Sequence, residues 1–324
     1  MADINRNVAE NLRFCGPALV ADESMLQKVI QVVMDITSRK HPCQEDFGAD
    51  EELQEAMEET SEFDWIVIDT ALEVVSGLAA ALGESFAGLW KIFQKTLLRF
   101  AGSSENIERS TAVGVLSECI IGMGSAVTPY TASFLRLLIH RLRDEDPQTK
   151  SNAAYALGRL IEKSSADAEI LTEYPAILER LEPCLRQEYS RLPDNATGCL
   201  SRMILKHHNN VPLGEVLPAI VEVLPLKEDY EENGPLYRMV CQMCMSWSLI
   251  NISLFGHIML TISTDKWEDT TIRQLTPSLL PIFQSVLCGD ENQLEDERRH
   301  ELIELVTWLN KVQPGVAPWV EQLG

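Results

Sequence analysis

Apolar residues in the middle of the chain recur with the spacing of an α-helix. In the stretch DPQTKSNAAYALGRLI they stand three or four positions apart and form one helical face. These residues are Ala153, Ala156, Leu157, Leu160 and Ile161. Asp146 holds the place of an N-cap, and Pro147 follows at the first helical position, where its missing N–H costs nothing. Leu135, Leu138 and Leu142 form an earlier stripe, so the sequence predicts two helices that turn at residues 144–147.

The same pattern returns about every 42 residues. Four segments align, namely DTALEVVSGL, STAVGVLSEC, SNAAYALGRL and DNATGCLSRM, and they begin at Asp69, Ser110, Ser151 and Asp194. One hairpin of this length cannot bury its own apolar face, so stacked copies supply the core. Two helices per repeat at this period are typical of HEAT repeats. We therefore predict an all-α fold, a right-handed α-α superhelix (HEAT-repeat solenoid), in which residues 1–324 form a single array of about six hairpins.

Two segments interrupt the period, and surplus residues in repeat proteins form insertions between helices. The first, residues 44–64, is strongly acidic. The second, residues 245–264, reads MSWSLINISLFGHIMLTIST and contains no charged residue. We expect an acidic loop and a helix or loop that packs on the array. The second is long enough to span a bilayer, although its polar residues argue against that; a contact patch and a translated artefact of gene structure stay open.

The acidic insertion holds ten carboxylates in the twenty residues from Glu45 and no lysine or arginine. They are Glu45, Asp46, Asp50, Glu51, Glu52, Glu55, Glu58, Glu59, Glu62 and Asp64. One interpretation is a solvated linker, which this composition favours. The other is a polyanion that covers basic proteins and speeds their capture at low salt. The sequence leaves both open.

The charge of the whole chain limits the class of partner. It has 49 acidic and 27 basic residues, a net charge of -22. Nucleic acid would be repelled, because its binding draws on lysine and arginine, whereas basic proteins would be attracted. We expect neither a nucleic acid nor a membrane as partner. The eight cysteines show no framework spacing and we find no signal peptide, which predicts reduced thiols in the cytosol or nucleus.

Motifs for catalysis or metal binding are incomplete. Cys241 and Cys244 form a C-x-x-C, but neither a second such pair nor a histidine pair completes four zinc ligands. The stretch HELIE at residues 300–304 lacks the second histidine of a zinc protease. We therefore predict that the chain is not an enzyme and uses no metal and no cofactor.

Several stretches resemble the carboxy-terminal half of an importin-β family nuclear import receptor, of the importin-four type. They are RKHPCQ with the acidic run after it, AVGVLSECIIGMG (112–124), KSNAAYALGRL (150–160), DNATGCLSRMI (194–204) and LPLKEDYEENG (224–234). Two features depart from the family pattern. Pro193 stands where a basic residue is usual, which puts an unbroken aspartate–arginine ladder in doubt, and residues 245–264 have no counterpart.

The resemblance implies a carrier of basic cargo, with core histones and ribosomal proteins and their lysine-rich signals as partners. It implies shuttling between cytoplasm and nucleus, and we expect a monomer. Ran GTPase is expected only for the full-length receptor, because the family binds Ran through amino-terminal repeats and this chain begins inside a repeat. The alternative is a HEAT-repeat scaffold subunit that organises other proteins.

The candidate site lies on the second helices of the predicted hairpins, which line the concave surface of such a solenoid. Glu73 and Glu118 supply carboxylates there, while Asn152, Tyr155 and Asn195 supply neutral oxygens and an aromatic wall. A lysine ammonium has three donors and no acceptor, so this combination suits it. We predict that Glu118, Asn152, Tyr155 and Asn195 form a lysine pocket. The alternative is that both asparagines tie helix starts to neighbouring loops and that Tyr155 only packs.

Overall fold

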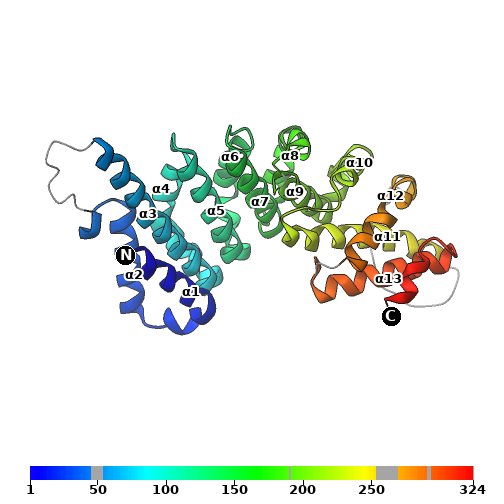
Figure 1. Cartoon of the computed structure of the whole chain (residues 1–324), viewed down its shortest axis with the longest axis horizontal. Helices are drawn as coiled ribbons and strands as arrows, with labels where there is room; N and C mark the ends of the chain where they lie inside the picture. The colour runs from blue at the N-terminus through cyan, green and yellow to red at the C-terminus, as the bar shows by residue number, and fades with distance from the viewer. Residues whose placement is uncertain (45–53, 190, 253–268, 290–292, 324) are drawn as a thin grey trace. The chain divides into compact units, whose positions relative to one another are not determined.

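The computed structural model describes residues 1–44, 54–189, 191–252, 269–289 and 293–323 (Figure 1). Every regular element in these ranges is an α-helix or a short 3-10 helix, as the predicted all-α fold requires. The chain divides into two compact units, Met1–Ile170 and Leu171–Gly324, and each is described by itself. The array of about six hairpins stays a prediction.

In the first unit, even-numbered and odd-numbered helices alternate along the chain and pack in pairs (Figure 1). Its helices are α1 Ala2–Leu19, α2 Glu23–Thr37, α3 Gln54–Leu82, α4 Phe86–Ala101, α5 Asn106–Met123, α6 Thr131–Arg141 and α7 Pro147–Lys163. Each even-numbered helix packs on the odd-numbered helix after it. The odd-numbered ones, called second helices below, pack side by side in the order α1, α3, α5 and α7.

The predicted hairpin of residues 131–163 is confirmed in its details. Asp146 caps α7, because its Oδ2 accepts a hydrogen bond of 2.7 Å from the N–H of Thr149, and Pro147 is the first helical residue. The apolar stripe of α7 is fully buried. Trp90 of α4 and Phe134 of α6 fill the space between these two even-numbered helices. Their ring centroids are 5.2 Å apart, and the rings meet edge to face. Such an aromatic pair adds about 0.5–1.5 kcal/mol beyond the area that it buries.

Small residues let the second helices of this unit approach closely. A Cβ atom added at Gly122 of α5 would lie 2.5 Å from the carbonyl oxygen of Ala79 in α3. A Cβ atom at Gly16 of α1 would lie 2.5 Å from the Cβ of Ala81, also in α3. Both contacts are too short for any larger residue, so these glycines set the distance between neighbouring second helices.

The second unit continues the alternation. It contains α9 Arg191–His207, α10 Leu213–Val223, α11 Asn233–Ile252, α12 Asp269–Cys288 and α13 Asp296–Val312, while α8 Asp167–Leu181 contains the boundary between the units. The second helices α9, α11 and α13 again pack in succession, and α12 packs on α11 and α13. Leu236, Tyr237, Phe283 and Leu302 are buried in its core.

The acidic insertion is not a loop throughout. Residues 45–53 lie outside the described ranges, and with them Glu45, Asp46, Asp50, Glu51 and Glu52. Residues 54–64 form the first three turns of α3, so the prediction of a loop over 44–64 is wrong for this part. The physical reason is helix propensity, because this segment consists mainly of glutamate, glutamine, alanine and methionine. Glu55, Glu58, Glu59, Glu62 and Asp64 therefore belong to a helix.

The apolar insertion begins as a continuation of α11, which runs through Ile252. Residues 253–264 lie outside the described ranges. Two other stretches, Asp64–Ala101 and Asn106–Arg141, are apolar and long enough for a membrane span, and 61% and 50% of their most apolar windows are buried in the protein. Each contains two repeat helices, so core packing accounts for their composition.

Candidate functional site

Asn152 joins two second helices. Its Nδ2 donates a hydrogen bond of 2.8 Å to the carbonyl oxygen of Ser110 in α5, and its Oδ1 accepts one of 2.8 Å from Nε2 of Gln148. Gly114 leaves the room for this bridge, since a Cβ atom there would lie 3.3 Å from Nδ2. Asn152 thus ties α7 to the neighbouring helix α5, and not to a loop as the alternative interpretation has it, and these bonds engage both ends of its amide.

Tyr155 lies one helical turn beyond Asn152 on α7, and Glu118 lies about two turns beyond Ser110 on α5. Glu118 is exposed and Tyr155 is partly buried. The guanidinium of Arg159 lies 5.7 Å from the centroid of the Tyr155 ring and forms an ion pair of 3.1 Å with Glu162. The predicted aromatic wall therefore stands beside a cation of the chain itself. The sequence prediction left out this charge, although Arg159 follows Tyr155 by one turn.

Asn195 is not a surface residue. Its exposed fraction is 2%, and it belongs to the second unit, in α9. The neighbouring Asp194 is fully buried and accepts hydrogen bonds from the N–H groups of Lys227, Glu228 and Asp229, at 3.0, 2.8 and 2.9 Å. The start of α9 is thus bound to the connection before α11. The prediction that Asn195 lines a lysine pocket is wrong, because its side chain is inside the repeat.

Glu73 lies within a group of charged side chains on α1 and α3. Burial raises the pKa of its carboxyl group, and the nearby Asp69 raises it further, while Arg13 and Arg6 lower it. The pKa of Asp69 is also raised by burial, against a hydrogen bond from Thr111. Both carboxylates are thus only partly compensated, and an added positive charge would stabilise their ionised forms.

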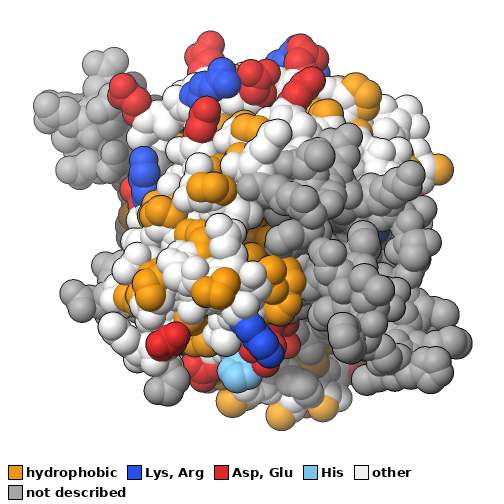
Figure 2. Space-filling view, turned by 90° about the vertical axis from the view of Figure 1, so that its right-hand side faces the viewer, with side chains coloured by type: hydrophobic (Ala, Val, Ile, Leu, Met, Phe, Trp, Pro, Cys, Tyr) orange, Lys and Arg blue, Asp and Glu red, His pale blue; other side chains and the backbone are white. Residues whose placement is uncertain are grey.

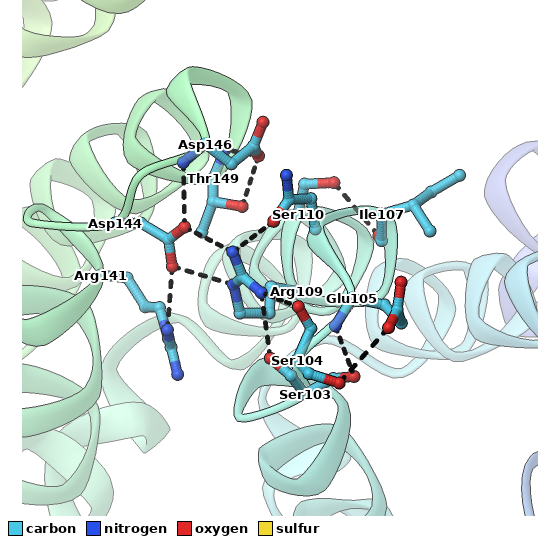
Figure 3. A network of polar contacts seen from close by, with 11 residues as sticks. Ser103, Ser104, Glu105, Ile107, Arg109, Ser110, Arg141, Asp144, Asp146 and Thr149 are labelled. Atoms are coloured by element: carbon cyan, nitrogen blue, oxygen red, sulfur yellow. Dashed lines mark hydrogen bonds and ion pairs between the residues drawn. The ribbon is translucent and has the colours of Figure 1, made fainter.

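A second set of charged residues, around Asp144, has a structural role and forms one rung of an aspartate–arginine ladder, whose unbroken course Pro193 puts in doubt (Figure 3). Nε and Nη2 of Arg109 donate to the two carboxylate oxygens of Asp144 at 3.0 and 2.8 Å, and Arg141 donates to Asp144 at 2.8 Å. Burial raises the pKa of Asp144, but the bonds from Arg109, the N–H of Asp146 and Arg141 together outweigh it, so the pKa lies below its ordinary value. Arg109 also donates to the carbonyls of Ser103 and Ser104.

The ladder has a counterpart in the second unit despite Pro193. Arg191, two residues before the proline, donates to Asp229 at 3.1 Å. Deeper in the same unit, Arg202 and Glu232 form a buried, two-pronged ion pair, in which Nη2 donates to Oε1 at 2.9 Å. The sequence pattern does not single out Glu232, because its partner Arg202 stands 30 residues away.

Acidic and basic side chains occur together on the face of the molecule that Figure 2 shows. In the view of Figure 2, hydrophobic side chains lie at the centre of the coloured surface, and acidic and basic side chains lie together along its upper edge. Asp64, one of the predicted acidic-loop residues, is paired with Arg39 at 2.9 Å and accepts from Gln44 at 2.6 Å. Acidic side chains are thus interspersed with basic ones both on the coloured part of the face in Figure 2 and, elsewhere in the chain, around Asp64.

The cysteine pair of the C-x-x-C lies inside the second unit. Burial raises the pKa of both the Cys241 and the Cys244 thiol to about 12. The thiols are therefore protonated near neutral pH and poorly suited to bind a metal. Among the residues that the structure describes, no group of three histidine, cysteine or acidic side chains is placed to hold a metal ion.

The family match and the similar proteins all belong to one family of proteins. The family described as "Importin subunit beta-1-like, TPR repeats" matches residues 22–183, half of the chain. The chain is 36% identical over 286 residues to the probable importin subunit beta-4 of Schizosaccharomyces pombe, a match that covers 86% of this chain and 25% of that protein. It is 30% identical over 303 residues to importin-4 of Homo sapiens, covering 93% of this chain and 25% of that one.

A solved structure shows the same fold. The karyopherin Kap121p bound to the SUMO protease Ulp1p superposes with a TM-score of 0.63 at 14% sequence identity, over 100% of this chain and 29% of Kap121p. This confirms the HEAT-repeat fold class that the period predicts. The chain spans about a quarter of the length of its curated relatives. By sequence and by fold, the chain belongs to the importin-β family.

Proposed function

We propose that the chain is a cargo-binding part of a nuclear import receptor and that its cargo is basic protein, of the class of core histones and ribosomal proteins. The observation that carries the proposal is the net charge of -22 on a chain that is 36% identical to a probable importin subunit beta-4 and 30% identical to an importin-4. A surplus of this size attracts basic partners and repels nucleic acid. The receptor would shuttle between cytoplasm and nucleus, and Ran GTPase would act on its full-length form.

The contact site that we propose is smaller than the predicted pocket. It consists of Glu118 and Tyr155 on adjacent second helices, with Glu73 one helix further along. Asn152 has a structural role. Its bond to Ser110 holds α5 and α7 in register, and its bond to Gln148 fixes the orientation of its amide. The guanidinium of Arg159 lies over the Tyr155 ring and would repel a second cation that approaches the same face of the ring. An extended basic segment would therefore meet the carboxylate of Glu118 first.

The acidic run has a separate role in the proposed function. Its ten carboxylates would attract basic cargo before contact and hold it away from nucleic acid. This part needs only a high density of charge near the site, whether the residues belong to a loop or to the start of α3.

The test compares binding of the whole chain to core histones and to a panel of neutral proteins at two salt concentrations. We expect preference for the histones and affinity that falls as salt rises, since exposed charges are screened. Equal binding to the neutral panel, with no dependence on salt, would favour the scaffold alternative and overturn the proposal.

A further inference from the structure

Two neighbouring helices of the first unit, α4 and α6, carry basic residues and no acidic one. Their sequences are FAGLWKIFQKTLLRFA and TASFLRLLIHR. The chain as a whole has the opposite balance, with 49 acidic and 27 basic residues. The rings of Trp90 and Phe134 pack between α4 and α6, which lie next to each other in Figure 1. Their basic side chains therefore belong to one region of the surface.

The cations of α4 form a stripe along its exposed side. Lys91, Lys95 and Arg99 follow one another at intervals of four residues, and all three are exposed. The buried side of α4 packs on α5, so the stripe faces away from that helix. Arg136 of α6 is also exposed and has the register of Lys95, because each follows a buried phenylalanine by two residues. We call Lys91, Lys95, Arg99 and Arg136 the basic face.

The charge of the basic face is not balanced by the described part of the chain. None of its four residues forms an ion pair with a residue that the structure describes. Nη2 of Arg99 donates a hydrogen bond of 2.7 Å to the carbonyl oxygen of Thr37, and the guanidinium lies 4.6 Å from the centroid of the Phe100 ring. Both of these partners are neutral, so they orient the guanidinium and leave its charge uncompensated.

We propose that the basic face is a docking site for a short, extended acidic segment of another protein. A helix rises 1.5 Å per residue, so successive cations of the α4 stripe lie about 6 Å apart along its axis. Side chains on one side of an extended peptide repeat every 6.6–6.8 Å or so, about the same spacing. Carboxylates at alternate positions would therefore meet Lys91, Lys95 and Arg99 in turn. Arg136, on a helix about 8–10 Å away, would hold the segment from the side.

The ends of the stripe favour a peptide over a larger polyanion. Glu84 precedes α4 and Glu105 follows it, and both are exposed. The stripe between Lys91 and Arg99 is about 12 Å long, a length that about four extended residues span. A nucleic acid or an anionic membrane extends further and would meet the two glutamates, which repel it within a Debye length of about 8–10 Å.

The experiment measures the affinity of a fluorescent oligoglutamate peptide for the whole chain by anisotropy. One variant combines Lys95→Glu with Arg136→Glu and so reverses two charges of the basic face. The matched control combines Arg186→Glu with Lys311→Glu, at exposed positions of the second unit. The two variants have the same total charge, so a difference between them reports on the location of the charges.

We expect the basic-face variant to bind the peptide about tenfold or more weakly than the control does, because a charge reversed at a contact acts more strongly than one reversed elsewhere. Equal affinities would show that only total charge matters and would overturn the proposal. Tighter binding of a single-stranded oligonucleotide of the same charge would also overturn it, because the occupant would then be a nucleic acid.

A lysine-rich peptide separates this inference from the proposed function. The acidic segment is assigned to even-numbered helices, whereas basic cargo is proposed to bind second helices, so both variants should bind the lysine-rich peptide equally. A change confined to the basic-face variant would show that the two ligands share one surface and would overturn the inference. Failure of the original chain to bind the lysine-rich peptide would count against the proposed function alone.

Carbodiimide crosslinking gives a result that needs no variant. The reagent joins a carboxylate to a lysine amine in contact with it, and peptide mass spectrometry locates the link. We expect the oligoglutamate peptide to join Lys91 and Lys95 in about fivefold or higher yield than Lys311, which is also exposed. Equal yields at the three lysines would overturn the proposal.

The same reagent, applied to the chain alone, tests whether its own acidic run is the occupant. Two residues that flank this run contact the end of α4, since Thr37 accepts from Arg99 and the Trp65 ring packs on Phe100 with centroids 5.6 Å apart. Links from the basic face to residues 45–64 would show that the run itself covers the face, and that result would overturn the proposal of a separate partner.

Discussion

Gly198 lies directly against the carboxylate of Glu232, and a Cβ atom added at Gly198 would stand 1.3 Å from Oε2. The absence of a side chain on α9 is what makes room for Glu232, and Glu232 in turn neutralises Arg202 one turn further along the same helix. A glycine in the middle of a helix ordinarily costs about 0.5–1 kcal/mol relative to alanine. Here it makes possible an ion pair whose partners are both buried.

Gly198→Ala should therefore destabilise the chain strongly. Displacing Glu232 leaves Arg202 buried without its partner, and breaking such a pair costs about 3–5 kcal/mol. The measurement is the free energy of unfolding in urea. Gly214→Ala is the matched control, because nothing lies within 4 Å of its added Cβ atom; it should be neutral or slightly stabilising. Similar values for both variants would contradict the packing described.

The two rungs of the ladder should differ in strength. Arg109→Ala removes a buried partner of Asp144 and should cost about 3–5 kcal/mol of unfolding free energy. Arg191→Ala removes a half-exposed partner of Asp229 and should cost at most about 1 kcal/mol. Chemical denaturation of both variants checks the order. A larger loss for Arg191→Ala would mean that burial does not control these pairs.

Charge reversal at Glu118 should weaken cargo binding. Glu118→Lys places a positive charge where a basic segment is proposed to bind, so its affinity for a lysine-rich peptide should fall by about tenfold or more at moderate salt. Glu321→Lys makes the same change of charge at an exposed site in the second unit and serves as the control. If both variants bind the peptide as the original chain does, Glu118 is not part of the site.

The acidic run should govern the speed of capture. Replacing its ten carboxylates by the corresponding amides should lower the association rate for a basic protein and flatten the dependence of that rate on salt, with little change in dissociation. Stopped-flow measurements at several salt concentrations test this. An unaltered rate profile would leave the run with a role in solubility alone.

Stability near Glu73 should depend on pH. Burial, together with Asp69, raises the folded pKa of Glu73 above its unfolded value of about 4.3. Between those two values the folded chain binds more protons than the unfolded one, so the free energy of unfolding falls as pH rises through that window. Glu73→Gln removes this penalty. We expect the variant to be more stable than the original at pH 7, with a smaller advantage at pH 4, as urea unfolding at each pH would show.

The sequence was sufficient for the repeat, because helical spacing is a local property. The cap at Asp146, the turn before Pro147 and the buried stripe of α7 all depend on residues within one hairpin. The error over residues 54–64 arose because charge density was given more weight than helix propensity. Glutamate is both strongly charged and a good helix former, so composition does not separate a solvated loop from a solvated helix.

The candidate site was harder to predict, because its residues are defined by contacts between repeats. Asn152 and Asn195 hold the same register position, yet one bridges to Ser110 and the other is buried in α9. Nothing within either repeat tells them apart. Glu232 shows the same limit, since only the three-dimensional structure brings Arg202 and the space above Gly198 to it.

The contacts of Gly16 and Gly122 with Ala81 and Ala79 have a consequence for how such a protein can change its partners. Spacing between these helices depends on small residues and backbone, whereas the recognition that we propose depends on the side chains of Glu73, Glu118 and Tyr155. The proposed recognition could therefore be changed while the small residues that set the helix spacing are kept. A combinatorial library that varies those three positions and keeps the four small ones fixed should yield well-folded proteins with new ligand preferences.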